Sequence, residues 1–520
     1  MSPRSRVLVI AIQEATLDLI RPWVEDGTLP TLKKMMDSGI SGVMLGMEPL
    51  TTPHSWGTIL TGTGAGRHGV FDFWQRDNRG RFVPTTRASL REKPVWTLLN
   101  ERGLKPAILN VPLTFPPEPA GGFMVSGLEA PGITRAIAAP PEIYDQITQR
   151  FGNYRPAAVF PGGRQKSDYV GLFERETSRQ AEVYAHLLSN NDWDFGMVYF
   201  VDAAMAQHYF WADMASGDAA NPYRNVLKTA YRCLDEAIAR LTAVAGPEAT
   251  VFVVSECGAG PIRYGVQINT WLEQEGFLSW KRSASSDPGS MSRRARSTLG
   301  TLAKAGKALA KRRLPESIRF WLNQHLPTLK GSQADSANKG VDWARTRAFA
   351  QGKEGSLFIN LEGRDPHGIV APGAEYEAVR QEIIGRLGEL RDPETGEKAV
   401  TRVCRREELF RGPNTDLAPD LFIEWRDDMY MPAEQEGERD KVFVTRYREG
   451  MSWPTSGSHR LEGVLIASGP QIRPGAEVSG VTIFDLLPTW LRLLGQPVPE
   501  GLEGRVIDGI LSTAVVERTA

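Results

Sequence analysis

The amino-acid sequence predicts an α/β fold in which helices cover a central, mainly parallel β-sheet. Two observations lead to this expectation: short apolar runs rich in β-branched residues recur along the chain, and helix-like segments separate most of them. Short apolar strands that alternate with helices are typical of parallel sheets. The 520 residues are 41% hydrophobic and 24% charged, which is ordinary for globular proteins and excludes a disordered or fibrous chain.

Each expected element follows from its local pattern. The first strand is the apolar run at residues 7–12, and the helical stretch that follows it has apolar residues at Leu19, Trp23, Leu29 and Leu32. Further strands are expected at residues 106–109, 195–201, 250–254, 356–360 and 463–467. Ligands of parallel sheets bind just beyond the carboxyl ends of the strands, so the residues that follow each run are the candidates for function.

Charge, cysteine content and hydropathy exclude several classes of protein. Lys and Arg total 61 and Asp and Glu 62, giving a net charge of −1, so no nucleic-acid partner is indicated. The three cysteines, Cys233, Cys257 and Cys404, lie far apart and form neither a disulfide framework nor a CxxC metal motif. The first apolar run is too short for a signal-peptide core, and no run reaches the ~18 residues of a membrane span. We therefore expect a cytoplasmic protein.

Residues 281–313 form a basic segment that stands apart from the rest of the sequence. They contain ten Lys or Arg and one acidic residue, Asp287. The first part is rich in Ser and Gly, and the second part carries a helical stripe of apolar residues. Two interpretations are open: a solvated basic helix that caps the domain, and a surface for an anionic membrane or another polyanion.

The pattern along the chain predicts one discontinuous main domain with insertions. We expect residues 1–275 and 341–515 to form the α/β domain. Residues 276–340 are then a basic cap insertion, and residues 134–190 a helical cap element. Neither cap carries a sequence signal for a particular substrate, and the oligomeric state is left open.

Hydroxyl side chains stand at the start of an expected helix. Thr52 precedes Pro53, and Ser55 follows two residues later. One interpretation is a helix N-cap, because these side chains accept hydrogen bonds from free N–H groups of the first turn. The other is a nucleophile at the helix N-terminus, where the N–H groups and the helix dipole favour an anion such as phosphate. The residues alone favour the N-cap.

Side chains that can bind metals or take part in catalysis lie beside several of the expected strands. They are Gln13 and Glu14 after the first strand, Asp202 and His208 after residues 195–201, Glu256 and Cys257 after residues 250–254, and His459 and Arg460 just before residues 463–467. Each histidine taken alone is more often structural than a ligand. Because the ends of parallel strands meet at one edge of a sheet, we expect these side chains to converge on one site.

Several motifs together carry a resemblance to a known family. They are VLVI at residues 7–10, PLTTP at 49–53, TG at 61–62, HGVFDF at 68–73, QHYFW at 207–211, APDL at 418–421, SGSHR at 456–460 and DLLPTWL at 485–491. With these motifs the chain resembles the type I phosphodiesterase/nucleotide pyrophosphatase branch of the alkaline phosphatase superfamily. The resemblance covers nearly the whole chain and implies an alkaline-phosphatase-like α/β fold with a helical or irregular cap insertion.

The resemblance also implies a chemistry. Enzymes of this family use two divalent metal ions, zinc or zinc-like, to stabilise the attacking and leaving oxygens of a phosphoryl transfer. A Thr or Ser attacks phosphorus and forms a covalent intermediate that water hydrolyses. The nucleophile position falls on Thr52. The histidine positions of one metal site fall on His208 and His459, and its Asp position falls on Ala204.

The second metal site of the family departs further from its usual residues. Its Asp, Asp and His positions fall on Gln13, Glu256 and Cys257. Gln lacks the negative charge of Asp, whereas a cysteine thiolate is a competent zinc ligand. The ordinary two-metal site is therefore not expected, and a divalent cofactor, zinc or manganese, could be present as one ion instead of two, or be absent.

Two one-metal sites are left open by the residues. One uses His208 and His459 with Asp202, and the other uses Glu14 with Glu256 and Cys257. Two further side chains could bind substrate. His54 could act as a base or an extra ligand, or be a polar residue at the helix start, and Arg460 could neutralise a substrate oxyanion or form a structural salt bridge.

Three functions are compatible with these residues. The first is a metal-dependent hydrolase or transferase, phosphodiesterase- or phosphatase-like, that acts on a phosphate ester, phosphodiester or related anion, with Thr52 as nucleophile. The second is a catalytically inactive relative that binds a phosphorylated ligand or serves as a scaffold. The third, and weakest, is nucleophilic chemistry at Cys257, since no Lys, Arg or His adjoins it in sequence.

Overall fold

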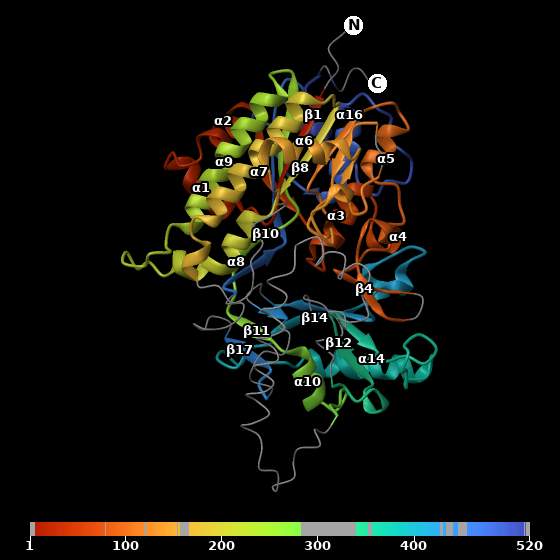
Figure 1. Ribbon diagram of the computed structural model, residues 1–520. Helices are drawn as coiled ribbons and strands as arrows, with labels where there is room; N and C mark the ends of the chain where they lie inside the picture. Colours follow the sequence, from red (N-terminus) through yellow and green to blue (C-terminus); the bar gives the residue numbers. More distant parts are fainter. Residues whose placement is uncertain are drawn as a thin grey trace.

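The computed structural model describes residues 6–77, 80–118, 121–152, 154–155, 166–281, 340–351, 356–426, 430–432, 440–445, 455–513 and 515. Apart from Lys281, the basic segment 281–313 lies outside these residues, so both interpretations of it stay predictions. Figure 1 shows a larger α/β lobe above a smaller lobe that contains α10, α14 and β12.

The larger lobe is built on a nine-stranded sheet with the strand order β20-β2-β19-β9-β1-β8-β5-β6-β7. Its strands are β1 (Arg6–Ile12), β2 (Ile40–Leu45), β5 (Pro106–Leu109), β6 (Phe123–Val125), β7 (Ala138–Ala139), β8 (Phe195–Phe200), β9 (Ala249–Ser255), β19 (Glu462–Ser468) and β20 (Val481–Thr482). Every pair from β9 to β6 is parallel, whereas β19 and β7 run antiparallel to their neighbours. The expected mainly parallel central sheet is thus confirmed.

Helices cover both faces of this sheet. One face carries α1 (Leu17–Glu25), α2 (Pro30–Ser38), α7 (Leu172–Asn190), α8 (Asp202–Ala215) and α9 (Val226–Ala245), and the other carries α3 (Thr52–Thr61), α5 (Val95–Asn100) and α16 (Leu486–Leu493). Side chains of β1 alternate between the two cores: Leu8 and Ile10 pack on the first face, Val7 and Val9 on the second. A strand buried on both faces therefore appears in the sequence as a continuous apolar run.

The helical stretch expected after the first strand is two helices rather than one. Helix α1 ends at Glu25, and Pro30 begins α2 at its first position. Gly27, with a φ of 80°, ends the first helix, and Pro30 fits the first turn of the second, where its missing N–H would have no partner.

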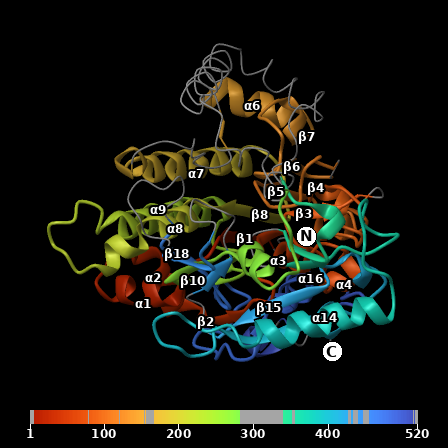
Figure 2. The ribbon, with the colours of Figure 1, turned by 90° about the horizontal axis from the view of Figure 1, so that it is seen from below.

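Part of the expected cap element 134–190 belongs to the main core. The buried side chains of α7 pack against α9, and Figure 2 shows α6 (Glu142–Phe151) beyond α7 on the outer side of this layer. The proposed domain boundaries themselves stay a prediction. Within the described ranges, no helix has the combination of length and apolar character needed to cross a membrane.

The smaller lobe has a sheet and a core of its own. Its four strands are ordered β12 (Ala348–Ala350), β13 (Leu357–Ile359), β15 (Leu421–Trp425) and β14 (Val400–Arg405), all antiparallel. Helix α14 (Ala374–Leu387) contributes Ile383 and Leu387 to its core. The strand expected at 356–360 lies in this second sheet and not in the central one. A short apolar run predicts a buried strand but does not specify which sheet the strand joins.

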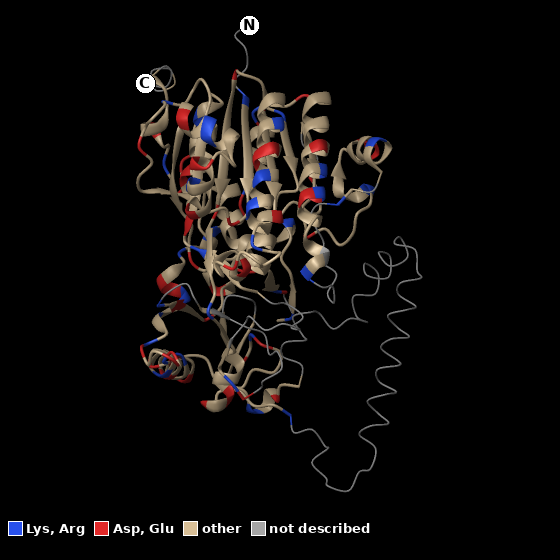
Figure 3. Ribbon diagram, turned by 90° about the vertical axis from the view of Figure 1, so that its left-hand side faces the viewer, with Lys and Arg blue, Asp and Glu red and all other residues tan. Residues whose placement is uncertain are grey.

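Shorter elements complete the described fold. The short helices are α4 (Ala65–His68), α10 (Ile268–Gln274) and α15 (Arg406–Leu409). Two strand pairs are formed by β3 (Trp74–Arg76) with β4 (Phe82–Pro84) and by β10 (Gly258–Pro261) with β18 (Gly457–Arg460), and a three-stranded sheet by β16 (Tyr430–Pro432), β11 (Tyr264–Val266) and β17 (Phe443–Thr445). The 3₁₀ turns lie at Arg87–Ser89, Arg135–Ile137, Lys166–Tyr169, Trp343–Arg345, Thr415–Leu417, Ile483–Asp485 and Asp508–Ile510. Figure 3 shows acidic and basic residues interspersed on the helices, whereas the central strands carry almost none.

Candidate functional site

A buried carboxylate and two imidazoles meet beyond the end of β1. The Glu14 side chain is fully buried, and its Oε1 lies 3.2 Å from Nε2 of His208 and 2.9 Å from Nε2 of His459. The two histidine side chains are 15% and 11% exposed, so the group opens to solvent on their side. Among the described residues, this is the one group in which three ligand atoms of this kind lie within 4.8 Å of one another.

Backbone carbonyls hold both imidazoles with Nε2 directed at Glu14. Nδ1 of His208, in α8, lies 2.8 Å from the carbonyl oxygen of Gly457, and Nδ1 of His459, in β18, lies 2.6 Å from that of Leu50. A carbonyl oxygen can only accept, so each Nδ1 carries a hydrogen and each Nε2 faces Glu14. Metal-binding histidines are typically oriented in this way.

The negative charge of Glu14 depends on its two histidine neighbours. Burial alone would raise the pKa of Glu14, but the charges and hydrogen bonds of His208 and His459 outweigh it and hold the pKa well below its usual range. Glu14, which has no exposure to solvent, is therefore ionised where the two imidazoles carry their protons. A buried anion needs a compensating positive charge, and a divalent cation held by the neutral imidazoles would supply it in place of those protons.

Residues of α8 and α9 fix the backbone of Glu14. Glu14 has a φ of 59°, in the left-handed region that costs a non-glycine residue about 1 kcal/mol or more. Its carbonyl oxygen accepts a hydrogen bond of 2.9 Å from Nε2 of Gln207, and Gln207 Oε1 accepts one of 3.0 Å from the Tyr231 hydroxyl. Gln207 was not among the expected site residues, although it adjoins His208 in the QHYFW motif.

Thr52 lies at the start of α3, with its hydroxyl bound to Gln13. The Gln13 Nε2 donates a 2.9 Å hydrogen bond to Thr52 Oγ1. The helix N-cap is Thr51, whose side chain accepts from the His54 N–H, and Ser55 lies buried inside the helix. The N-cap interpretation of Thr52 and Ser55 is therefore wrong, because the helix begins at Thr52 and the preceding threonine caps it.

Glu256 and Cys257 lie after β9, as the sequence indicates, but outside the Glu14 group. The Glu256 side chain is buried, and neither carboxylate oxygen has a hydrogen bond of normal geometry to a described residue. Burial raises the pKa of Glu256 to about 7, and the nearby charge of Glu14 adds to this rise. The Cys257 side chain is also buried.

Asp202 faces away from the imidazoles. It is the first residue of α8, and its carboxylate accepts hydrogen bonds of 3.0 Å from Thr177 and 3.2 Å from Gln180, both in α7. A spacing of six residues, at about 100° per residue, places Asp202 and His208 roughly 120° apart around the helix. Asp202 thus does not complete a site with His208 and His459, and Glu14 stands in its place.

The two expected substrate-binding side chains are held in structural contacts. His54 is fully buried, its Nδ1 donates to the Pro49 carbonyl at 2.8 Å, and burial lowers its pKa to about 4. Arg460 donates to the carbonyl oxygens of His459, at 2.7 Å, and Pro261, and so ties β18 to β10. His54 thus matches its structural alternative, a polar residue at the helix start, whereas these contacts of Arg460 are with backbone carbonyls and not the salt bridge that its structural alternative expects.

A cleft between the lobes reaches the candidate site. It has a volume of about 120 Å³, and His459 and Leu50 form part of its wall on the larger lobe. Arg402, Trp425 and Tyr430 line it from the smaller lobe. A ligand in this cleft would contact His459 directly.

Comparisons with known proteins agree with the fold and the resemblance. The chain matches the family model of type I phosphodiesterase/nucleotide pyrophosphatase over residues 7–452. No curated protein matches it by sequence.

Solved structures share the fold at low sequence identity. Phosphonoacetate hydrolase from Sinorhizobium meliloti 1021, in complex with phosphonoformate, superposes with a TM-score of 0.54 at 12% identity, covering 95% of this chain and 96% of that one. Human ectonucleotide pyrophosphatase/phosphodiesterase 5 gives 0.51 at 11% identity, covering 98% and 100%. An inactive form of the murine protein, in complex with AMP, gives 0.53 at 11% identity over the same shares.

The fold is accordingly alkaline-phosphatase-like, as the resemblance implies. The family model spans most of the chain, from the first strand of the central sheet to beyond the described strands of the smaller lobe. The protein therefore belongs to the type I phosphodiesterase/nucleotide pyrophosphatase family.

Proposed function

We propose that this protein is a phosphoester hydrolase whose site holds a single divalent cation between Glu14, His208 and His459. The observation that carries the proposal is the convergence of both Nε2 atoms on one buried, ionised carboxylate. One carboxylate and two imidazoles suit zinc or manganese, and three protein ligands leave a position for water or substrate.

A second cation is not part of this proposal. Gln13 supplies no negative charge, and its amide nitrogen is engaged by the Thr52 hydroxyl. Glu256 and Cys257 do not form a further group of three close ligand atoms with other described residues. The residues present thus fit one ion better than two.

The protein side chains have separate tasks in the proposed reaction. A bound divalent cation would polarise a phosphoryl oxygen and lower the pKa of a coordinated water. Glu14 compensates positive charge in the buried site, and the carbonyls of Gly457 and Leu50 keep the imidazoles directed at it. The positive end of the α3 helix dipole favours a phosphate beside Thr52.

Thr52 is the proposed nucleophile. Its oxygen attacks phosphorus, the ester oxygen leaves, and water then hydrolyses the phosphothreonine. The Gln13 amide donates to Thr52 Oγ1. Such a hydrogen bond stabilises the oxygen most when it loses its proton, so Gln13 both orients the nucleophile and favours its reactive form.

A second function is favoured by the ligand positions that differ from the family pattern. Ala204 has no ligand atom, and Gln13 has no charge. A protein with these residues could retain the cleft and bind a phosphorylated ligand without turning it over. Metal content and the state of Thr52 distinguish this binding protein from the hydrolase.

Elemental analysis of the purified full chain tests the metal site. After incubation with zinc or manganese and removal of excess, we expect about one ion per chain, because three protein ligands define one position. The double variant His208→Ala/His459→Ala should lose it, whereas His367→Ala, an exposed histidine in the smaller lobe, should retain it. A wild-type protein without bound metal would contradict the proposal.

Turnover of bis(p-nitrophenyl) phosphate and p-nitrophenyl phosphate tests the reaction. The hydrolase should release p-nitrophenol in a metal-dependent way, Thr52→Ala should lose this activity, and quenched wild-type protein should carry phosphate on Thr52. Metal binding without turnover and without phosphorylated Thr52 would instead support the binding protein.

A further inference from the structure

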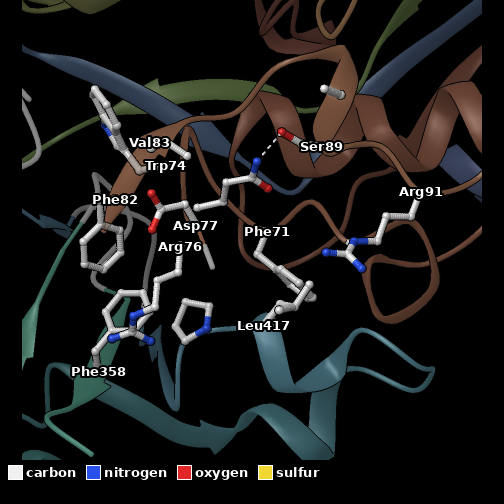
Figure 4. Close-up of a pocket in the computed structure, with 14 residues that line it drawn as sticks. Phe71, Trp74, Arg76, Asp77, Phe82, Val83, Ser89, Arg91, Phe358 and Leu417 are labelled. Atoms are coloured by element: carbon white, nitrogen blue, oxygen red, sulfur yellow. Dashed lines mark hydrogen bonds between the residues drawn. The ribbon is translucent and has the colours of Figure 1, made fainter. Parts of the chain in front are cut away.

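A second cavity, separate from the cleft at His459, lies between the lobes. It has a volume of about 350 Å³ and is formed by the β3–β4 hairpin and the following turn on one side and by Phe358, Leu417 and Pro419 on the other (Figure 4). We call it the hairpin pocket. None of its lining residues also lines the cleft. Cavities of roughly 300 Å³ and above are large enough for a small organic ligand.

Aromatic side chains form much of the wall. Phe71, Trp74, Phe82 and Phe358 all line the pocket. The rings of Phe82 and Phe358 meet edge to face with centroids 5.2 Å apart, and Leu417 at the rim is 42% exposed. Aromatic faces of this kind favour a planar ring, because ring stacking adds to the burial of apolar surface.

A buried guanidinium stands at one side of the pocket. The Arg76 side chain is only 10% exposed and lies over the rings of Phe358, at 4.4 Å, and Phe82, at 5.2 Å. Its Nη2 is 2.6 Å from Asp365, but its buried Nε has no hydrogen-bond partner among the described residues. A buried N–H without a partner destabilises the protein unless a ligand or water accepts from it.

A second guanidinium stands across the pocket. Arg91 is exposed, and its side chain has neither a hydrogen bond nor an ion pair with any other described residue. Figure 4 shows its guanidinium directed toward Phe71, opposite the Arg76–Phe358 pair. The acidic residue of the lining, Asp77, is engaged by Arg81 at 2.7 Å. The pocket therefore offers positive charge to an anion.

We propose that the hairpin pocket is a second binding site, for a small molecule that carries an aromatic ring and a phosphate or carboxylate group. The ring packs among Phe71, Trp74 and Phe82, and the anionic group pairs with Arg91. Because the walls come from both lobes, the ligand joins them and stabilises their contact. The site is independent of the proposed metal centre.

Calorimetric titration of the full chain tests this site, with phenyl phosphate and benzoate as probes. The background is the double variant His208→Ala/His459→Ala, in which binding at the metal centre is removed. We expect at least one probe to bind this protein. Arg91→Ala in the same background should weaken the binding about tenfold, the effect of losing a charge-assisted hydrogen bond. The matched change Arg240→Ala, at an exposed position of α9, should not.

The contribution of the ring is measured separately. Inorganic phosphate serves as a third probe without a ring. Trp74→Ala should weaken the binding of phenyl phosphate and leave that of inorganic phosphate unchanged, which a purely structural role of Trp74 would not produce. Comparison of phenyl phosphate with benzoate distinguishes a phosphate ligand from a carboxylate ligand. The proposal is overturned if neither probe binds the double variant, or if binding is unaffected by Arg91→Ala. Neither result would bear on the metal content of the wild type.

Discussion

Glu14 is the residue on which the candidate metal centre depends. Its carboxylate contacts both imidazoles, and it is held in a left-handed backbone conformation that few non-glycine residues adopt. Such a conformation persists only where the surroundings impose it. Here the hydrogen bond from Gln207 to the Glu14 carbonyl oxygen does so.

We predict that Glu14→Gln strongly weakens metal binding. The change keeps the size of the side chain but removes its charge, and the zinc affinity should fall roughly 100-fold, since a neutral amide oxygen is a much poorer ligand. Competition with a chromophoric chelator measures this affinity. The matched change Glu256→Gln should leave it nearly unaltered, and a larger loss there would place the ion beside Glu256 instead.

Helix α8 is the element that joins the parts of the site. It begins directly after β8 and presents His208 to the metal centre and Gln207 to the backbone of Glu14. Tyr231 of α9 in turn donates to Gln207 and accepts a 3.3 Å hydrogen bond from the Thr16 N–H. The contact between the two helices thus determines where the segment after β1 lies.

Gln207→Leu should therefore affect both stability and metal binding. It leaves the Glu14 carbonyl without its Gln207 donor and the Tyr231 hydroxyl without its acceptor, which costs about 1–3 kcal/mol for buried polar groups. Since Gln207 positions a ligand, the metal affinity should also fall about tenfold. Urea unfolding and chelator competition measure the two effects. Tyr231→Phe should show the same pattern at smaller size, and lower stability with unchanged metal affinity would rule out a positioning role.

At the scale of the whole molecule, a buried network of charges organises the smaller lobe and its contact with the larger one. Asp420 is fully buried and accepts hydrogen bonds from Arg364 at 2.6 and 2.7 Å and from the Tyr376 hydroxyl at 2.6 Å. Next to it, Asp365 binds Arg76 of the β3–β4 hairpin at 2.6 Å. The hairpin of the larger lobe is thereby tied to the smaller lobe.

The network predicts a loss of stability in acid. Burial alone would raise the pKa of Asp420, but the hydrogen bonds and charge of Arg364, together with Tyr376, lower it below its usual value. The folded state therefore binds this proton less tightly than the unfolded state. The stabilisation is complete above about pH 4, the ordinary pKa of Asp, and is lost as the pH falls through the lower folded value.

Asp420→Asn checks this assignment. It removes the carboxylate that accepts two hydrogen bonds from Arg364 and leaves this largely buried guanidinium with Asp365 as its acidic partner, which should cost about 3 kcal/mol. The urea midpoint, followed by tryptophan fluorescence across this pH range, should fall and become less dependent on pH. Asp416→Asn removes a partner of Arg406 that is 91% exposed and should change little. An equal pH dependence in wild type and Asp420→Asn would contradict the assignment.

Much of the fold follows from local sequence patterns. The run at the first strand and the other central strands are recognisable because burial on both faces of a sheet demands continuous apolar residues. The division between α1 and α2 was missed although Pro30 marks it. The strand Leu357–Ile359 has the same apolar pattern as the central strands, so its sequence could not show that it pairs in a second sheet.

Local patterns were enough to recognise the side chains that could do chemistry. Glu14, His208 and His459 lie beside expected strands of the α/β sheet, and Thr52 lies at the start of an expected helix. Which of them meet became known from the folded arrangement: Glu14 joins the two histidines, Asp202 faces α7, and Gln13 binds Thr52. The physical reason is that element type depends on local periodicity, whereas convergence depends on strand order and on the rotation of each helix against the sheet.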